Sequence, residues 1–275
     1  MNHNVFWRRL LNYLYSHVSL RNVLIVPFVC QICGTVGLVG YLSFINGQKA
    51  VNDLVIRLQN EISHQVDHHL DTYLNTPKQI NQINVDAINL GMLNLEDFQT
   101  SGKYFWKQMQ VFNVGYINYA NTKGEFIGVE RLNNGKVLLN EVSAKNPGKL
   151  YVYTTDNEGN PTKLTTVKNY DPRLEAWYAD AVKAGKPIWS QIYQWEDKPE
   201  ILSISSSYPL YDQNKQLVGV IGVDLILSQI KDFLQEIEVG RTGKIFIIEP
   251  SGLIVASSNE EQPYTVINKQ VKRLS

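Results

Sequence analysis

Residues 170–181 read YDPRLEAWYADA, and the fold depends on what this stretch packs against. An Asp-Pro pair before a charged and aromatic run is typical of a helix start, because Asp171 can cap the helix and Pro172 fits its first turn. Gly185 is expected to end the helix. The stretch is therefore predicted to be one helix, held by the elements on either side of it.

Three large aromatic residues crowd this short stretch: Tyr170, Trp177 and Tyr178. Large aromatics inside a domain more often belong to the packed core than to a binding site. The same side chains also build ligand pockets, where their faces attract cations. Two interpretations stay open here: a helix packed on a sheet, or the wall of a pocket that binds a small molecule.

Strand patterns flank the stretch on both sides. Alternating or continuous apolar runs, separated by turns rich in Gly and Asn, predict strands over residues 114–121, 126–132, 137–142, 149–156, 161–167, 188–195, 200–212 and 216–226. Residues 227–237 are expected to form a closing helix. The fold class is therefore α+β, with a central antiparallel sheet and a long helix behind it.

The overall composition limits which kinds of partner are expected. The chain has 275 residues, of which 44% are hydrophobic and 11% aromatic, and its formal net charge is zero. That is enough apolar material for a sizeable core. A neutral chain offers no basic field for nucleic acid, so no nucleic-acid partner is expected.

Residues 23–45 read VLIVPFVCQICGTVGLVGYLSFI and contain no charge. This run is long enough to cross a bilayer as a helix. A signal peptide is the alternative, but its apolar region is shorter and a small-residue cleavage site should follow. The only cysteines, Cys30 and Cys33, lie inside the run, so they are interpreted as lipid-compatible residues and not as a redox or zinc pair.

The charges around this run predict its direction. Arg8, Arg9 and Arg21 precede it, and Lys49 follows it closely. The positive-inside rule then places residues 1–22 in the cytoplasm, and everything after about residue 46 on the periplasmic or extracellular side of a bacterial plasma (inner) membrane. Within the cytoplasmic segment, residues 5–18 are expected to form a short amphipathic helix at the membrane surface.

Residues 46–98 are expected to form a stalk helix. Apolar residues recur there at steps of three and four, and Pro77 is expected to kink the helix or divide it in two. Such a stripe must pack against its own domain or a second copy, so a homodimer is expected. His64 and His68 have zinc-ligand spacing, but a solvated helix face is the preferred interpretation, and no metal or cofactor is predicted.

These features together resemble the double Cache (dCache_1-like) extracytoplasmic sensor domains of bacterial chemoreceptors, sensor histidine kinases and nucleotide cyclases. Two motifs carry the resemblance: Y-D-P-R-x-x-x-W-Y with a later G-V-D-L strand, and G-x-T-G-x-x-F-I-I-x-x-x-G from residue 240. The resemblance implies a PAS-like, membrane-distal, ligand-binding lobe over residues 99–238. Residues 239–275 would then begin a second, incomplete, membrane-proximal lobe.

The resemblance also implies a ligand site. The residues that match the family's amino-acid-binding pattern are Tyr170, Trp177, Tyr178, Tyr193 and Asp224. The position of the family's carboxylate-binding Arg is occupied by Glu175, while Arg173 is the other Arg of the segment. A like charge at Glu175 would weaken binding of a carboxylate. The expected ligand is therefore an amine, a polyamine or a quaternary ammonium compound, with an ordinary amino acid less favoured.

The predicted function is ligand sensing by a membrane receptor with one or two spans. Catalysis is not expected, because the sequence has no G-x-S-x-G, H-E-x-x-H or Walker A motif, and a kinase or cyclase output would lie outside this chain. The alternative is a module that only dimerises or binds a partner protein. Convergence of the site residues on one cavity would favour ligand binding over this alternative.

Overall fold

The computed structural model describes residues 19–132, 134–195, 198, 201–237, 243–249, 251–259, 264–267 and 270–273. The amphipathic helix expected over residues 5–18 lies outside them. The chain divides into two compact units, residues 1–63 and residues 64–275, and each is described by itself.

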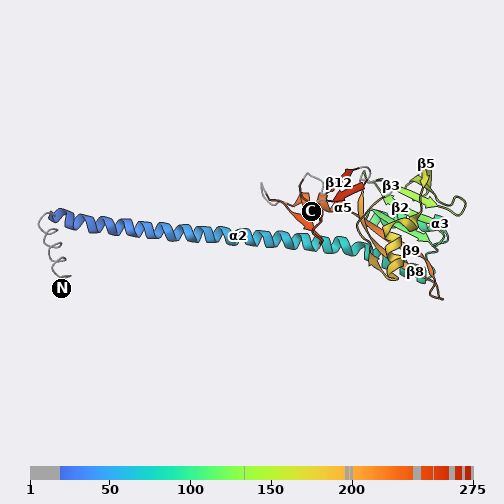
Figure 1. The fold of residues 1–275 in the computed structure, drawn as a ribbon, viewed down its shortest axis with the longest axis horizontal. Helices are drawn as coiled ribbons and strands as arrows, with labels where there is room; N and C mark the ends of the chain where they lie inside the picture. Colours follow the sequence, from blue (N-terminus) through green and yellow to red (C-terminus); the bar gives the residue numbers. More distant parts are fainter. Residues whose placement is uncertain are drawn as a thin grey trace. The chain divides into compact units, whose positions relative to one another are not determined.

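One long helix, α2 (Leu20–Asn89), runs through both units (Figure 1). It contains an apolar stretch, with a mean hydropathy of 2.1, that is long enough to cross a membrane. The helix continues through Pro77, so the expected division there is wrong. A proline leaves the carbonyl four residues earlier without its donor. Packing compensates, because Ile80, one turn later, is fully buried in the core of the second unit.

A nine-stranded antiparallel sheet forms the centre of the second unit (Figure 1). The strand order is β5-β4-β3-β2-β1-β9-β8-β6, and β7 also pairs with β8. The strands are β1 (Tyr116–Asn121), β2 (Phe126–Arg131), β3 (Val137–Val142), β4 (Lys149–Thr155), β5 (Pro161–Asn169), β6 (Ile188–Trp189), β7 (Tyr193–Gln194), β8 (Leu202–Tyr211) and β9 (Leu217–Ile226). The α+β prediction is confirmed.

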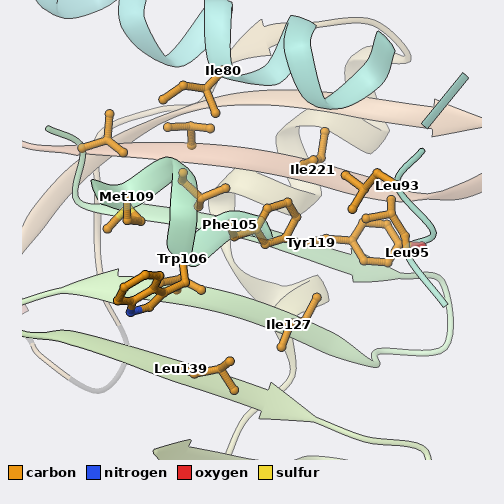
Figure 2. Close-up of a cluster of buried hydrophobic side chains, with 14 of the residues drawn as sticks. Ile80, Leu93, Leu95, Phe105, Trp106, Met109, Tyr119, Ile127, Leu139 and Ile221 are labelled. Carbon is orange, nitrogen blue, oxygen red and sulfur yellow. The ribbon is translucent and has the colours of Figure 1, made fainter. Parts of the chain in front are cut away.

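One face of the sheet is covered by α2 and α3 (Phe98–Val111). Figure 2 shows the core between them, where Phe105 and Met109 of α3 and Ile80 of α2 pack with Ile127 of β2 and Ile221 of β9. All five side chains are at most 1% exposed. This face holds the larger part of the apolar core.

The opposite face packs against α4 (Ala176–Ala184), whose Trp177 and Ala181 are buried in a second core cluster. The expected single helix from Pro172 is wrong: Asp171 caps a 3₁₀ turn, Pro172–Leu174, and α4 begins only at Ala176. Glu175 therefore lies at the N-cap position of α4. The helix ends, as expected, at Gly185, whose φ of 65° is left-handed.

Helix α5 (Leu227–Glu236) follows β9 directly. Two small antiparallel pairs come after it, β10 (Phe246–Ile248) with β11 (Ile254–Ser257) and β12 (Tyr264–Ile267) with β13 (Gln270–Arg273). Helix α5 packs against β11. These pairs fall in the region 239–275 that is expected to begin a second lobe, which stays a prediction.

Candidate ligand-binding site

A row of polar side chains crosses the sheet on the α4 face. Tyr116 of β1 lies directly opposite Asp224 of β9 on one side and Glu130 of β2 on the other. Ser205 of β8 lies opposite Asp224. Directly opposite residues of an antiparallel sheet share a face. The pairing therefore places two carboxylates on the same face, with one tyrosine between them.

Asp224 is the most deeply placed of the predicted site residues. It is 1% exposed, and the Tyr193 hydroxyl donates to its Oδ2 at 2.5 Å. Burial raises the pKa of Asp224 to about 6, although the hydrogen bond from Tyr193 acts in the opposite direction. Burial and the nearby carboxylate of Asp224 also raise the pKa of Tyr193 well above its ordinary value.

Aromatic rings wall the pocket in front of Asp224. Trp177 of α4 is 2% exposed and Trp195, after β7, is 4% exposed. The Trp195 ring lies 5.4 Å from the ring of Tyr116, between centroids, and its indole N–H donates to Ser203 Oγ at 2.7 Å. Tyr170 completes this wall. The indole N–H of Trp195 is thus satisfied, and the Trp and Tyr rings form part of the lining.

The lining is rich in hydrogen-bond acceptors that lack donors. Asp224 Oδ1, Asn118 Oδ1 and Asn140 Oδ1 are buried and accept no hydrogen bond from the described part of the chain. All three residues line the same pocket. A buried acceptor without a donor costs free energy, so this arrangement favours a ligand that brings N–H groups.

Two further charged residues of the lining were missed from the sequence, Glu130 and Lys168. Glu130 is 3% exposed and forms an ion pair with Lys198. Its position in the apolar run FIGVERL was the available signal, because a carboxylate at a core-facing strand position needs a partner. Glu175 also lines the pocket, close enough to Tyr193 to help raise the pKa of that hydroxyl.

The cavity itself is small, about 20 Å³. That volume holds about one water molecule. A ligand with several heavy atoms therefore enters only if lining side chains move apart.

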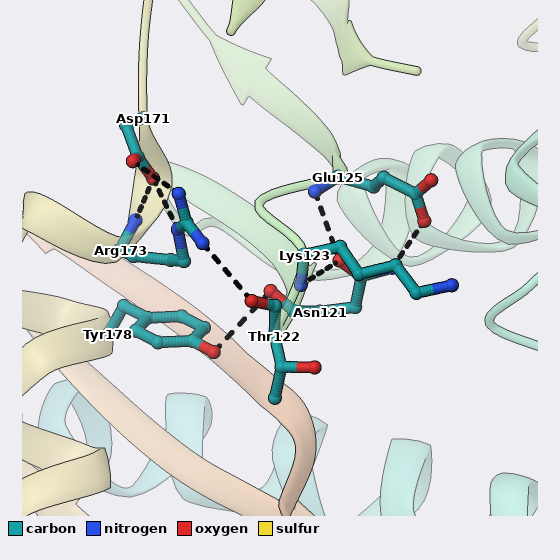
Figure 3. Close-up of polar contacts among 7 residues, drawn as sticks. All are labelled: Asn121, Thr122, Lys123, Glu125, Asp171, Arg173 and Tyr178. Atoms are coloured by element: carbon teal, nitrogen blue, oxygen red, sulfur yellow. Dashed lines mark hydrogen bonds and ion pairs between the residues drawn. The ribbon is translucent and has the colours of Figure 1, made fainter. Parts of the chain in front are cut away.

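Of the seven predicted site residues, five line this pocket: Tyr170, Glu175, Trp177, Tyr193 and Asp224. Arg173 and Tyr178 do not. Arg173 pairs with the Asp171 carboxylate and donates to the Thr122 carbonyl at 3.2 Å, in the turn between β1 and β2 (Figure 3).

The Tyr178 hydroxyl donates to the carbonyl of Asn121 at 3.4 Å in that same turn (Figure 3). The Arg173 hydrogen bonds to Asp171 hold the pKa of the Asp171 carboxyl below its usual value. Arg173 and Tyr178 thus attach the 3₁₀ turn and α4 to the β1–β2 turn, which positions the wall of the pocket from outside.

The family model of the Cache domain, dCache_1, matches residues 47–273. The chain belongs to the Cache family. The match includes the whole sheet, both motifs that carry the resemblance, and every residue of the pocket. The prediction of a Cache sensor domain is confirmed.

Individual proteins that resemble this chain share less than a third of its residues. The methyl-accepting chemotaxis protein McpA of Pseudomonas putida is 24% identical over 167 residues, which cover 60% of this chain and 26% of McpA. This chain thus spans about a quarter of the length of that relative. The ligand-binding domain of the Pseudomonas aeruginosa amino acid chemoreceptor PctC, solved with GABA, has a TM-score of 0.46 at 17% identity and 72% coverage of each chain. That of the Campylobacter jejuni chemoreceptor Tlp3, solved with L-valine, has a TM-score of 0.44 at 17% identity, over 76% of this chain and 69% of the other.

Proposed function

We propose that this chain is the extracytoplasmic ligand-sensing part of a membrane signal-transduction receptor, and that its pocket binds a small molecule bearing an amine. Asp224 carries the proposal. A buried carboxylate with one oxygen unsatisfied, surrounded by aromatic rings and further acceptors, matches what an ammonium group requires. No arginine of the described residues lines the pocket.

Membrane attachment supports the receptor role. Residues 23–45 lie in an apolar part of α2, and the basic residues before them favour a cytoplasmic N-terminus in the plasma (inner) membrane. A ligand that opens the small cavity favours one arrangement of the lobe over another, and α2 is the element that would pass this shift to the membrane. Any kinase, cyclase or other output activity is proposed to lie outside residues 1–275.

A ligand that also carries a carboxylate, such as an amino acid, is the second candidate. Lys168 lines the pocket and brings an ammonium to it. An amino acid would place its ammonium at Asp224, and Lys168 is the cationic residue of the lining that would meet its carboxylate. A Lys168→Gln variant separates the two candidates, because it should weaken amino acid binding and leave binding of a simple amine intact.

The test is a thermal-unfolding screen of the full chain in detergent micelles against amines, amino acids and organic acids. The proposal expects amines to raise the melting temperature of the native chain and not that of Asp224→Asn. Asp212→Asn is the matched control, since Asp212 is an exposed turn residue. A folded chain that responds to none of these compounds would support the alternative of a dimerisation or protein-interaction module.

A further inference from the structure

The pocket contains a second carboxylate that already holds an ammonium group. Glu130 is 3% exposed, and the Lys198 ammonium forms both an ion pair and a hydrogen bond with its Oε1. The same ammonium lies 5.6 Å from the centroid of the Trp195 ring. A carboxylate and an indole face around one ammonium is the arrangement by which proteins recognise cationic ligands.

Glu130 and Trp195 line the pocket. Lys198, after β7, supplies the cation from within the chain. The remaining Glu130 oxygen, Oε2, accepts from the Asn140 amide at 3.2 Å. A lysine ammonium is strongly hydrated, so it can leave a buried partner for solvent more readily than an arginine.

The two carboxylates stand in a fixed relation to each other. Asp224 and Glu130 are both direct cross-strand neighbours of Tyr116, so their backbones are two strand spacings apart, roughly 10 Å. Both side chains line the same pocket. A short flexible chain with a cation at each end spans such a gap.

We propose that Glu130 and the face of Trp195 form a second ammonium subsite, that Lys198 fills it in the ligand-free chain, and that the ligand is a dication whose second ammonium replaces Lys198. The inference rests on the proposed function, which places the first ammonium at Asp224. Lys198 then competes with the ligand from within the chain. The apparent affinity for the ligand falls in proportion to the fraction of molecules in which Lys198 leaves the subsite free.

The experiment compares 1,4-diaminobutane with butylamine by isothermal titration calorimetry on the full chain in detergent micelles. Lys198→Gln should raise the affinity for 1,4-diaminobutane by about tenfold, the order expected from one charge-assisted contact. The same variant should change the affinity for butylamine by less than about twofold. Glu130→Gln should abolish the preference for the diamine. Lys163→Gln, on the exposed part of β5, is the matched control and should change neither affinity.

Lys198→Gln leaves Glu130 buried without its cation, which can destabilise the fold. The double variant Lys198→Gln with Glu130→Gln removes both charges and should fold. It should bind the two amines equally well. If the double variant still prefers the diamine, the second subsite is not at Glu130 and the inference is overturned.

The outcomes also separate this inference from the proposed function. If the native chain binds both amines with equal affinity and Lys198→Gln changes neither, the inference fails while amine binding stands. An equal gain for both amines in Lys198→Gln would also overturn it, because Lys198 would then only close the pocket. If neither amine binds any variant, the proposed function and the inference fail together.

Discussion

At the scale of single residues, Asp224 is placed where an ionised carboxylate is costly. It is buried near the end of β9, between apolar neighbours along the strand. One of its oxygens accepts from Tyr193 and the other accepts nothing from the described chain. Proteins keep such a group where function needs it more than stability does. Two predictions follow from its titration.

The first concerns stability without ligand. Because the folded-state pKa of Asp224 is raised from 3.8 to about 6, the folded chain binds the proton more tightly than the unfolded chain, and stability falls as pH rises through that window. Asp224→Asn removes this cost. It should raise the free energy of unfolding at pH 7.5 by about 1 to 3 kcal/mol and by little at pH 4. Denaturant titration at both pH values measures the effect, and equal effects at the two pH values would contradict it.

The second concerns binding. A cationic ligand binds the ionised form of Asp224, while an aliphatic ammonium stays charged throughout this range. Amine affinity should therefore be constant above about pH 7 and fall by up to about tenfold per pH unit below the Asp224 pKa of about 6. Calorimetric titrations between pH 5 and pH 8 test this. A flat profile would show that the ligand's charge does not meet Asp224.

At the scale of elements, the pocket connects to the stalk through the end of β9. Asp224 is two residues before Ile226, and α5 begins immediately afterwards. The Tyr73 hydroxyl of α2 lies 3.1 Å from the Ile226 carbonyl oxygen and 2.9 Å from Gln229 Oε1 of α5. Burial raises the pKa of Tyr73 beyond its ordinary range. We propose that a shift of β9 on ligand binding would reach α2 through this tyrosine.

Tyr73→Phe tests this connection. The substitution removes one partly buried hydroxyl, so it should lower the free energy of unfolding by about 0.5 to 1.5 kcal/mol. It should leave amine affinity nearly unchanged, since Tyr73 does not line the pocket. Hydrogen exchange of residues 64–89, measured with and without amine, should respond to ligand in the native chain and less in the variant. An identical response in both would exclude Tyr73 from the connection.

The elements themselves were largely predictable from the sequence, because turns are marked by residue type. The predicted strands match the observed ones closely where a glycine with positive φ separates them, as Gly124, Gly135 and Gly159 do. The start of α4 was wrong because Asp171 caps a 3₁₀ turn as readily as an α-helix. Pattern alone did not distinguish the two.

The site was less predictable than the fold. Family resemblance led to Asp224 and Tyr193, which meet at 2.5 Å. Glu130 was missed because its role arises from register: it faces the pocket only because Tyr116 pairs with both β2 and β9. The carboxylate in the apolar run FIGVERL signalled that Glu130 needs a partner, but cross-strand neighbours are distant in sequence, so that signal did not show which side chains Glu130 would meet. For the same reason, the partners of Arg173 and Tyr178 in the β1–β2 turn were unforeseen.

At the scale of the whole molecule, the first unit presents an apolar stripe on α2 that needs a partner. Val51, Leu54, Val55 and Leu58 recur at helical spacing, and each is between 47% and 68% exposed. An exposed stripe of this kind, just after a candidate membrane span, favours a second copy in a parallel arrangement, because both copies would enter the membrane in the same direction. The proposed homodimer is therefore expected to pack along this stripe.

Disulfide cross-linking in membranes tests the proposed dimer. With Cys30 and Cys33 replaced by serine, Leu58→Cys should form covalent dimers under mild oxidation, because a stripe residue faces its own copy across a two-fold axis. Asn60→Cys is the matched control: two residues further along a helix, it points about 200° away and so lies on the opposite face. Non-reducing gels should show a dimer band for the first variant and little for the second. Equal cross-linking at both positions would indicate random collision. No cross-linking at either position would contradict the homodimer, and the stripe would then be expected to pack against a partner protein.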